Sequence, residues 1–253
     1  IKKTTVVAIR GAACLVGLPQ EARAAKKVYS PIVEQGELEI ETTGTYDFDH
    51  KKDKNAVQEY KNALGYGVTG RWATELYGEF ERQSREDGDG NTKLSRIKFT
   101  NVEWENRYQL FEQGQFWLDA GLYFEYEIPL QKKEPGKIEG KILLEKSFQS
   151  FTHTANIIFK KEIGGGAQAE TEGGFAWSSR YRLTEYFQPG FEYWIDFGEI
   201  NKHLPYNEQV HQLGPVFYGK IGHVKYNVGY LFGISDTAPE GELKWIAEYE
   251  FKF

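Results

Sequence analysis

Segments in which apolar and polar residues alternate follow one another from Gly36 to the last residue, Phe253. About twelve such segments, each of roughly 10–14 residues, can be distinguished. In the first, "GELEIETTGTYDFD", one face carries Leu38, Ile40, Thr42, Gly44, Tyr46 and Phe48. Most residues between them are charged. A period of two residues is that of a β-strand, and no helical period competes with it, so the chain is predicted to be all-β.

The same alternation specifies how each strand aligns with its neighbours. In "QFWLDAGLYFEYEI" (115–128) every second residue is apolar and the others include Asp119, Glu125 and Glu127, and in the final "ELKWIAEYEFKF" (242–253) every second residue is again apolar and most of the others are charged. A shift of one residue would turn a whole set of charges into the apolar face. The register of the predicted sheet is therefore strongly specified.

Composition agrees with strands and turns and excludes some functions. Aromatic residues make up 15% of the chain, and there are 27 glycines, which favours strands joined by turns. Beyond the N-terminus there is no run of about 18 apolar residues, so helical membrane spans are not expected. The net charge is -6, and there is no basic stripe of the kind that binds nucleic acid.

The connections between the segments are of two alternating kinds. Short turns such as "VTGR", "FEQG", "SFQS", "TEYFQP" and "KIGH" alternate with longer polar stretches such as "HKKDKN", "SREDGDGNT" and "NKHLPYNE". Outer-membrane barrels have this asymmetry, with short periplasmic turns and longer outer loops. Residues 36–253 are therefore predicted to form a single antiparallel transmembrane β-barrel of about 12 strands in a lipid bilayer.

The first residues, "IKKTTVVAIRGAACLVGLPQEARAAKK", have the features of an export signal. Two lysines precede an apolar stretch, and an A-x-A pattern ends at Ala24. Residues 1–24 are predicted to be a cleaved signal peptide, and residues 25–35 a periplasmic N-terminal segment. Arg10 interrupts the apolar stretch, which leaves an amphipathic mature N-terminus as the alternative. The only cysteine, Cys14, falls in the signal peptide; "GAAC" suits a lipoprotein signal poorly, so no thiol is expected in the mature chain.

The end of the chain resembles a known class of protein. Phe253, after Phe251 and Tyr249, resembles the C-terminal signal by which Gram-negative outer-membrane barrels are recognised by their assembly machinery. The stretch from His211 to Phe251 is also similar to the closing strands of proteobacterial outer-membrane transporters named after the meta-pathway of phenol degradation. The resemblance implies a location in the outer membrane of a Gram-negative bacterium, the assembly machinery as a partner, and passage of small molecules. It implies no catalytic or binding residue.

If the apolar phase faces lipid, the other phase lines the lumen. The lumen-lining candidates are Glu39, Glu41, Lys61, Glu79, Lys98, Arg107, Asp119, Glu125, Arg180, Arg182, Glu192, Asp196, Glu248 and Glu250. Folding the hairpins about their short turns predicts three cross-strand ion pairs: Arg107 with Asp119, Arg180 with Glu192, and Lys61 with Glu79.

These lumen charges have two interpretations. As structural pairs, each would contribute about 0.2–1 kcal/mol when wet. Acidic candidates outnumber basic ones, however, and the surplus would favour the passage of cations or neutral polar solutes. Large residues of the lumen phase could instead close the bore: Trp117, Tyr123, Trp194 and Tyr218.

Histidines offer two further hypotheses. An outer-membrane lipid hydrolase would place Ser and His on the lipid face, where His153 and Ser179 fall, but a hairpin centred on "IGGGA" is not expected to bring them into register. His203 and His211 flank one long connection, but no third metal ligand stands at a useful spacing. The chain is therefore expected to have no catalytic residue, metal or cofactor.

The sequence favours an outer-membrane channel or uptake pore that passes small polar or aromatic solutes passively through a mildly acidic lumen. A closed barrel with a structural or scaffold role is the alternative. A soluble barrel with inward aromatic residues is a third hypothesis. Against it, aromatic residues of the apolar phase gather near both strand ends, with Trp72 at one and Trp245 at the other, as at membrane interfaces.

Overall fold

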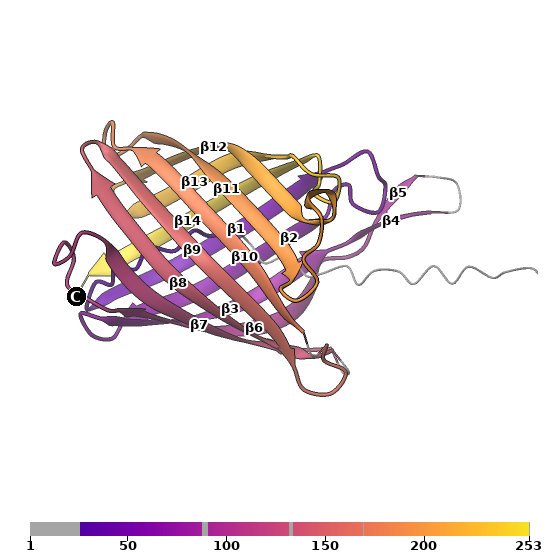
Figure 1. Cartoon of the computed structure of the whole chain (residues 1–253), viewed down its shortest axis with the longest axis horizontal. Helices are drawn as coiled ribbons and strands as arrows, with labels where there is room; N and C mark the ends of the chain where they lie inside the picture. Colours follow the sequence, from indigo (N-terminus) through magenta and orange to yellow (C-terminus); the bar gives the residue numbers. More distant parts are fainter. Residues whose placement is uncertain (1–25, 88–90, 132–133, 169, 253) are drawn as a thin grey trace, which may run out of the picture.

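Twelve antiparallel strands close into a barrel in the part of the chain that the structure describes (Figure 1). The computed structural model describes residues 26–87, 91–131, 134–168 and 170–252. The barrel strands are β1 (Glu37–Phe48), β2 (Gln58–Gly67), β3 (Trp72–Arg82), β6 (Lys98–Gln109), β7 (Asp119–Pro129), β8 (Gly136–Phe148), β9 (Phe151–Ile163), β10 (Thr171–Tyr181), β11 (Gln188–Glu199), β12 (Val210–Ile221), β13 (Val224–Gly233) and β14 (Gly241–Lys252). The predicted all-β barrel is confirmed.

Each barrel strand pairs with its neighbours along the chain, and β1 pairs with β14 to close the sheet. Two short strands, β4 (Ser84–Glu86) and β5 (Thr92–Leu94), form a separate hairpin between β3 and β6. A 3-10 helix, η1 (Tyr206–Glu208), lies in the connection before β12. No helix among the described residues is long and apolar enough to cross a membrane.

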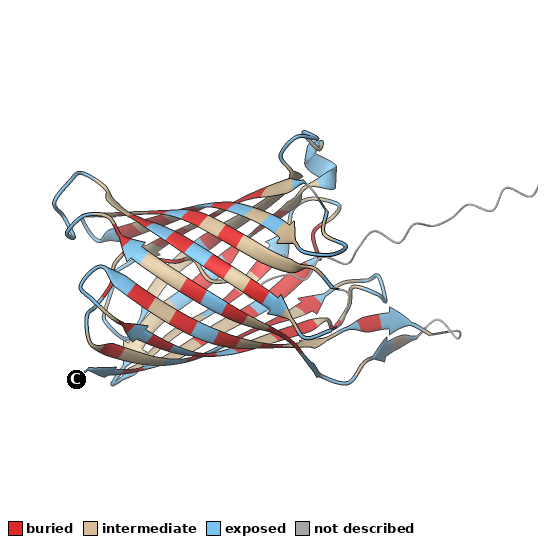
Figure 2. Cartoon of the chain, turned by 90° about the horizontal axis from the view of Figure 1, so that it is seen from below, coloured by how far each residue is buried: buried red, intermediate tan, exposed pale blue. Residues whose placement is uncertain are grey.

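The predicted two faces of the strands are confirmed by the burial of their side chains. In β1, Ile40 and Phe48 are exposed on the outside of the barrel, whereas Glu41 and Asp47 are buried inside it. The same alternation runs along the other strands as bands of buried and exposed residues (Figure 2). Apolar side chains therefore cover the outer surface, and charged side chains fill the interior. This is the reverse of the arrangement in a water-soluble protein.

The predicted asymmetry of the connections is confirmed, but one turn is longer than expected. Residues 110–118 join β6 to β7, so the connection is centred two residues later than the "FEQG" turn suggests. As a result Arg107 lies opposite Tyr123, and the predicted pair of Arg107 with Asp119 is wrong. Trp117 falls in this connection and is 77% exposed, so it does not fill the lumen.

The turn between β10 and β11 produces a second register error. Arg180 lies opposite Gly190, not opposite Glu192 as predicted, because the turn is centred one residue earlier than expected. The third predicted pair is confirmed, since Lys61 lies directly opposite Glu79. The tight turn between β2 and β3 makes that register readable from the sequence.

Residues 26–35, here called the lumen segment, run inside the barrel. Gly36, whose φ of 75° is a left-handed conformation that glycine adopts easily, connects them to β1. Its N–H donates to the carbonyl of Gly67 at the short-turn end (2.8 Å). Tyr29, Pro31 and Val33 are buried. The sequence predicts a periplasmic position for residues 25–35, whereas the structure places residues 26–35 within the barrel. The predicted signal peptide, 1–24, lies outside the described residues.

Candidate functional site

The inner face of the barrel contains most of the predicted lumen residues. Those that are buried are Glu41, Lys61, Glu79, Glu125, Glu192 and Glu250. Those that are half-buried are Glu39, Arg107, Arg180, Asp196 and Glu248. The strand alternation points each of them inward, and the closed sheet brings charges from distant parts of the chain together.

Three predicted lumen residues lie at strand ends or just beyond them. Lys98 is exposed where β6 begins, at the mouth of the barrel. Asp119 accepts a hydrogen bond from the N–H of Gly114 (2.6 Å), so it stabilises the turn before β7. Arg182 is exposed just beyond β10 and donates to the carbonyl of Phe151 (2.9 Å). Strand ends and turns, which alternation does not locate well, account for all three.

Ion pairs cross the interior between strands that are not neighbours. Lys61 Nζ lies 2.6 Å from Glu103 Oε1 and 3.9 Å from Glu79 Oε1. Thus the closer partner of Lys61 is on β6, not on the adjacent strand. Arg107, by contrast, donates to Glu75 on the adjacent strand β3 (3.1 Å). Such contacts join β2, β3 and β6 through side chains as well as through the sheet.

Lys27 of the lumen segment occupies an acidic site. Its ammonium group forms an ion pair with Glu41 and lies 3.4 Å from Glu248 Oε1 and 3.6 Å from Glu75 Oε2. The Tyr77 hydroxyl donates to Glu75 (2.6 Å) and also contacts Glu41 (3.0 Å). Three strands, β1, β3 and β14, therefore hold one ammonium group.

Lys26 occupies a second site nearer the long connections. Its ammonium group lies 2.5 Å from Glu242 Oε2 and donates to the side-chain oxygen of Gln212. Gln212 also donates to Glu242 (3.3 Å). Glu242 follows the connection before β14, and Gln212 follows the one before β12, so the lumen segment reaches toward the end opposite Gly36.

Tyr29 anchors the middle of the lumen segment. The Asn156 side chain accepts a hydrogen bond from the Tyr29 N–H and donates one to the Tyr29 carbonyl, both at 2.8 Å. The Tyr29 hydroxyl donates to the Glu105 carboxylate (2.9 Å). Its ring packs against Tyr123 and Leu143, the one buried apolar cluster found in the described interior.

The base of the lumen segment is held by polar contacts near the short turns. The N–H of Val33 donates to Gln109 Oε1 (2.9 Å). Lys252 donates to Glu34 (2.9 Å), and this hydrogen bond lowers the pKa of the Glu34 carboxyl. Sequence reasoning missed the whole segment as an interior element. The alternating apolar residues Tyr29, Pro31 and Val33 are the signal that could have found it.

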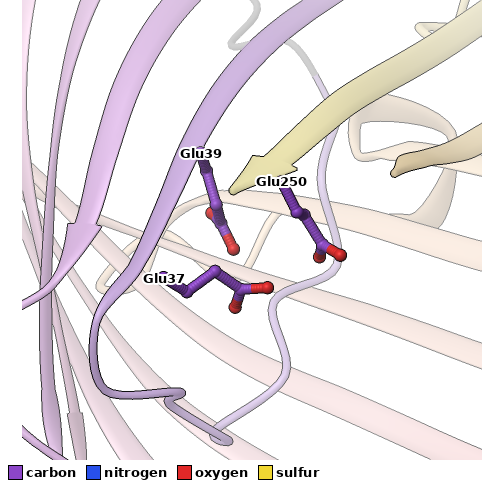
Figure 3. Close-up of side chains that lie close together, drawn as sticks. All are labelled: Glu37, Glu39 and Glu250. Atoms are coloured by element: carbon purple, nitrogen blue, oxygen red, sulfur yellow. The ribbon is translucent and has the colours of Figure 1, made fainter. Parts of the chain in front are cut away.

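Three groups of glutamates have the oxygen ligands that hard cations prefer. Glu37, Glu39 and Glu250, from β1 and β14, turn their carboxylates toward one another, with ligand atoms within 4.8 Å (Figure 3). The other groups are Glu79, Glu103, Glu127 and Glu103, Glu105, Glu125.

Donors of the chain itself already engage members of each group. Glu250 forms ion pairs with Lys220 and Lys225. Lys61 binds Glu103, and the Tyr29 hydroxyl binds Glu105. The described chain thus uses its own amines and hydroxyls where a cation would otherwise be needed.

The structure shows the surroundings of His153 and His211, the histidines of the two hypotheses. His153 lies directly opposite Ser179 on β9 and β10, so the expectation that they are out of register is wrong. Among the described residues no hydrogen bond joins these two side chains, and the His153 ring instead stacks against Phe151 and Trp177. Both ring nitrogens of His211 are engaged, by the Tyr193 hydroxyl (2.8 Å) and by Gln209 (3.0 Å), which leaves neither for a metal.

The resemblance to an assembly signal is carried by outward-facing residues. Tyr249 and Phe251 are exposed on β14, with ring centroids 4.6 Å apart. Phe253 lies outside the described residues. The outward aromatic pair at the end of the last strand remains a predicted recognition signal.

No protein-family model matches the sequence, and no curated protein matches it in sequence. Among solved structures, the NanC porin is similar over 85% of this chain and 100% of its own, with a TM-score of 0.55 and 9% identity. A bacterial polysaccharide outer membrane secretin has a TM-score of 0.42 at 10% identity, covering 87% of this chain and 99% of that one. The outer membrane channel DcaP of Acinetobacter baumannii has a TM-score of 0.34 at 8% identity, covering 85% and 96%. The likeness to the NanC porin shows a shared barrel fold.

Proposed function

We propose that this chain is an outer-membrane channel of a Gram-negative bacterium through which small polar or aromatic solutes pass passively, with cations favoured. The observation that carries the proposal is the pairing of an apolar outer surface with a charged bore wide enough to hold a second stretch of polypeptide. The twelve strands form the wall of the barrel, and residues 26–35 lie inside this wall. A bore of that width admits small solutes when the segment is elsewhere.

The outward apolar residues support a position in a bilayer. Replacing Leu76, in the middle of β3 and 56% exposed, by arginine should lower the free energy of unfolding in lipid vesicles by about 2–4 kcal/mol, because a charge at the bilayer midplane is poorly solvated. Urea-induced unfolding followed by tryptophan fluorescence measures this change. Leu94→Arg, in the hairpin strand β5 outside the barrel, is the matched control and should change stability by about 0.5 kcal/mol or less. Equal effects of the two substitutions would argue against a lipid-facing β3.

Conductance in planar bilayers tests passage itself. We expect discrete steps, and under a salt gradient a reversal potential displaced toward that of the cation, because carboxylates such as Glu105 and Glu248 line the bore. A polar fluorescent cation and an anion of matched size, loaded into vesicles, give the same comparison without voltage. Silence at all voltages from both the wild-type barrel and a folded barrel without its lumen segment would contradict a channel.

The runner-up is a closed barrel with a structural role. The observation that favours it is the filled interior, in which Tyr29, Tyr123 and Leu143 pack together. The conductance experiment separates the two functions, since a purely structural barrel stays silent whatever happens to the lumen segment. Lipid hydrolysis is tested by turnover of a phospholipid ester with His153→Ala as the control.

A further inference from the structure

The lumen segment is held mainly by side-chain hydrogen bonds, whereas the strands of the wall are held by backbone hydrogen bonds. Among the described residues, no backbone-to-backbone hydrogen bond joins residues 26–35 to the wall, and the nearest one runs from Gly36, which follows the segment, to Gly67. The hydrogen bonds of the segment with the wall each use at least one side chain, as with Asn156 and Gln109. A segment held in this way can leave without breaking the sheet ladder, which the strands complete among themselves.

The wall is shaped to receive the segment. Gly121 stands in the inward phase of β7, and a Cβ placed there would lie 2.9 Å from the Pro31 Cβ, closer than real carbon atoms approach. At Gly67 a Cβ would collide with the backbone carbonyl of Glu34. Glycine at these positions leaves the space that the segment fills. Pro31 is accordingly among the fully buried side chains.

The segment also brings positive charge to the acidic wall. The ammonium groups of Lys26 and Lys27 contact carboxylates contributed by β1, β3 and β14. An ammonium-bearing solute inside the bore would meet these same carboxylates. The segment and such a solute would therefore bind to the same carboxylates.

We propose that the lumen segment is an internal plug that closes the bore and occupies the carboxylate sites at which cationic, ammonium-bearing solutes bind during passage. Opening withdraws the segment, and a cationic solute competes with Lys26 and Lys27 for Glu242, Glu41 and their neighbours. Removal of the predicted signal peptide, 1–24, leaves the segment tethered at Gly36 alone. This inference rests on the proposed channel function, and it adds the device that controls the channel and the class of solute.

A disulfide that locks the segment tests the plug. Pro31→Cys and Gly121→Cys, combined with Cys14→Ser, place two thiols on facing positions, whose Cβ atoms need to move apart from 2.9 Å to the roughly 3.5–4.5 Å of a disulfide. The oxidised protein should be silent in planar bilayers, and reductant should restore openings. If the oxidised protein, with its disulfide formed, conducts as well as the reduced protein, the plug is overturned. Equal conduction by the oxidised and reduced proteins does not contradict the channel function.

Removal of the plug is the complementary test. Replacing residues 26–33 by a Gly-Ser sequence of the same length keeps the barrel wall intact and removes the anchoring side chains. Folding is checked by the temperature-dependent gel mobility of the intact barrel. The folded variant should be open for most of the recording. If the wild type and this variant conduct equally, the plug is overturned but the channel is not. If both proteins are silent, the channel is overturned as well.

The charges of the plug are tested with a matched pair of variants. Lys26→Gln with Lys27→Gln should raise the open fraction by about tenfold or more, because the docked state loses its ion pairs. Lys51→Gln with Lys52→Gln removes the same charge from an exposed outer connection and should leave the open fraction unchanged. A linear diamine should raise the open fraction of the wild-type barrel more than an uncharged diol of equal length. Equal responses to diamine and diol would overturn the competition.

Discussion

Replacing Lys244 by methionine should lower the free energy of unfolding by about 3–5 kcal/mol, because it leaves a buried carboxylate without its cation. Lys244 Nζ lies 2.7 Å from Glu192 Oε2, and the side chains are 1% and 0% exposed. The carboxylate keeps hydrogen bonds from Trp194 Nε1 (2.7 Å) and the Tyr218 hydroxyl (2.8 Å). These neutral donors do not replace the lost charge, so the penalty remains large. Urea-induced unfolding in lipid vesicles measures it.

Two controls distinguish a buried charge pair from general damage to β14. Adding Glu192→Gln to Lys244→Met should recover more than half of the lost stability, because no uncompensated charge is then buried. Lys202→Met breaks the exposed pair with Glu199 (2.5 Å) and should leave unfolding unchanged. If the double variant is as unstable as the single one, the loss comes from packing and not from the charge.

The alternation of the sequence predicts the barrel because it decides which side of the sheet each residue faces. Ile40 and Glu41 are neighbours in the chain, and one is exposed outside while the other is buried inside. The same reasoning correctly places Lys61 opposite Glu79, where a tight turn fixes the register. Closure of twelve strands follows from the number of alternating segments, since each pairs with the next along the chain.

Alternation does not encode which charged side chains pair inside the barrel. Arg107 binds Glu75 on β3, which is its neighbour in the sheet but distant in the chain, whereas the hairpin pattern suggests Asp119 on the following strand. Turn length decides such pairs, and irregular turns give little periodic signal. The contacts of Lys26, Lys27 and the rest of the lumen segment are harder still to predict, because a short extended stretch does not indicate which residues of the wall it meets.

The lumen segment also changes how the interior charges are interpreted. The predicted lumen residues of the wall alone have a surplus of acids, which either structural ion pairs or cation passage would explain. In the structure, Lys27 compensates part of that surplus at Glu41, Glu75 and Glu248. The same carboxylates thus serve as structural partners while the segment is docked and as exposed lumen charges when it is withdrawn. The two interpretations correspond to two states of one molecule.

The strength of docking depends most on Asn156, which is fully buried and binds both backbone groups of Tyr29. Asn156→Leu keeps the side-chain volume similar but leaves the Tyr29 N–H and carbonyl without partners. Each unpaired buried group costs about 1–3 kcal/mol, so docking should weaken by about 2–6 kcal/mol. The undocked population should then rise by at least about 30-fold.

Reaction of a thiol at position 30 with a maleimide in solution measures that population. In a Ser30→Cys, Cys14→Ser background, Asn156→Leu should accelerate labelling by the same factor of about 30 or more. Thr154→Val, one inward position away on β9, removes a hydrogen bond to Glu145 (3.0 Å) that does not touch the segment, and labelling should keep its wild-type rate. Equal acceleration by both substitutions would mean that the wall loosens as a whole. Acceleration by Asn156→Leu alone, accompanied by longer openings in bilayers, would tie the state of the bore to a single amide that holds the segment in place.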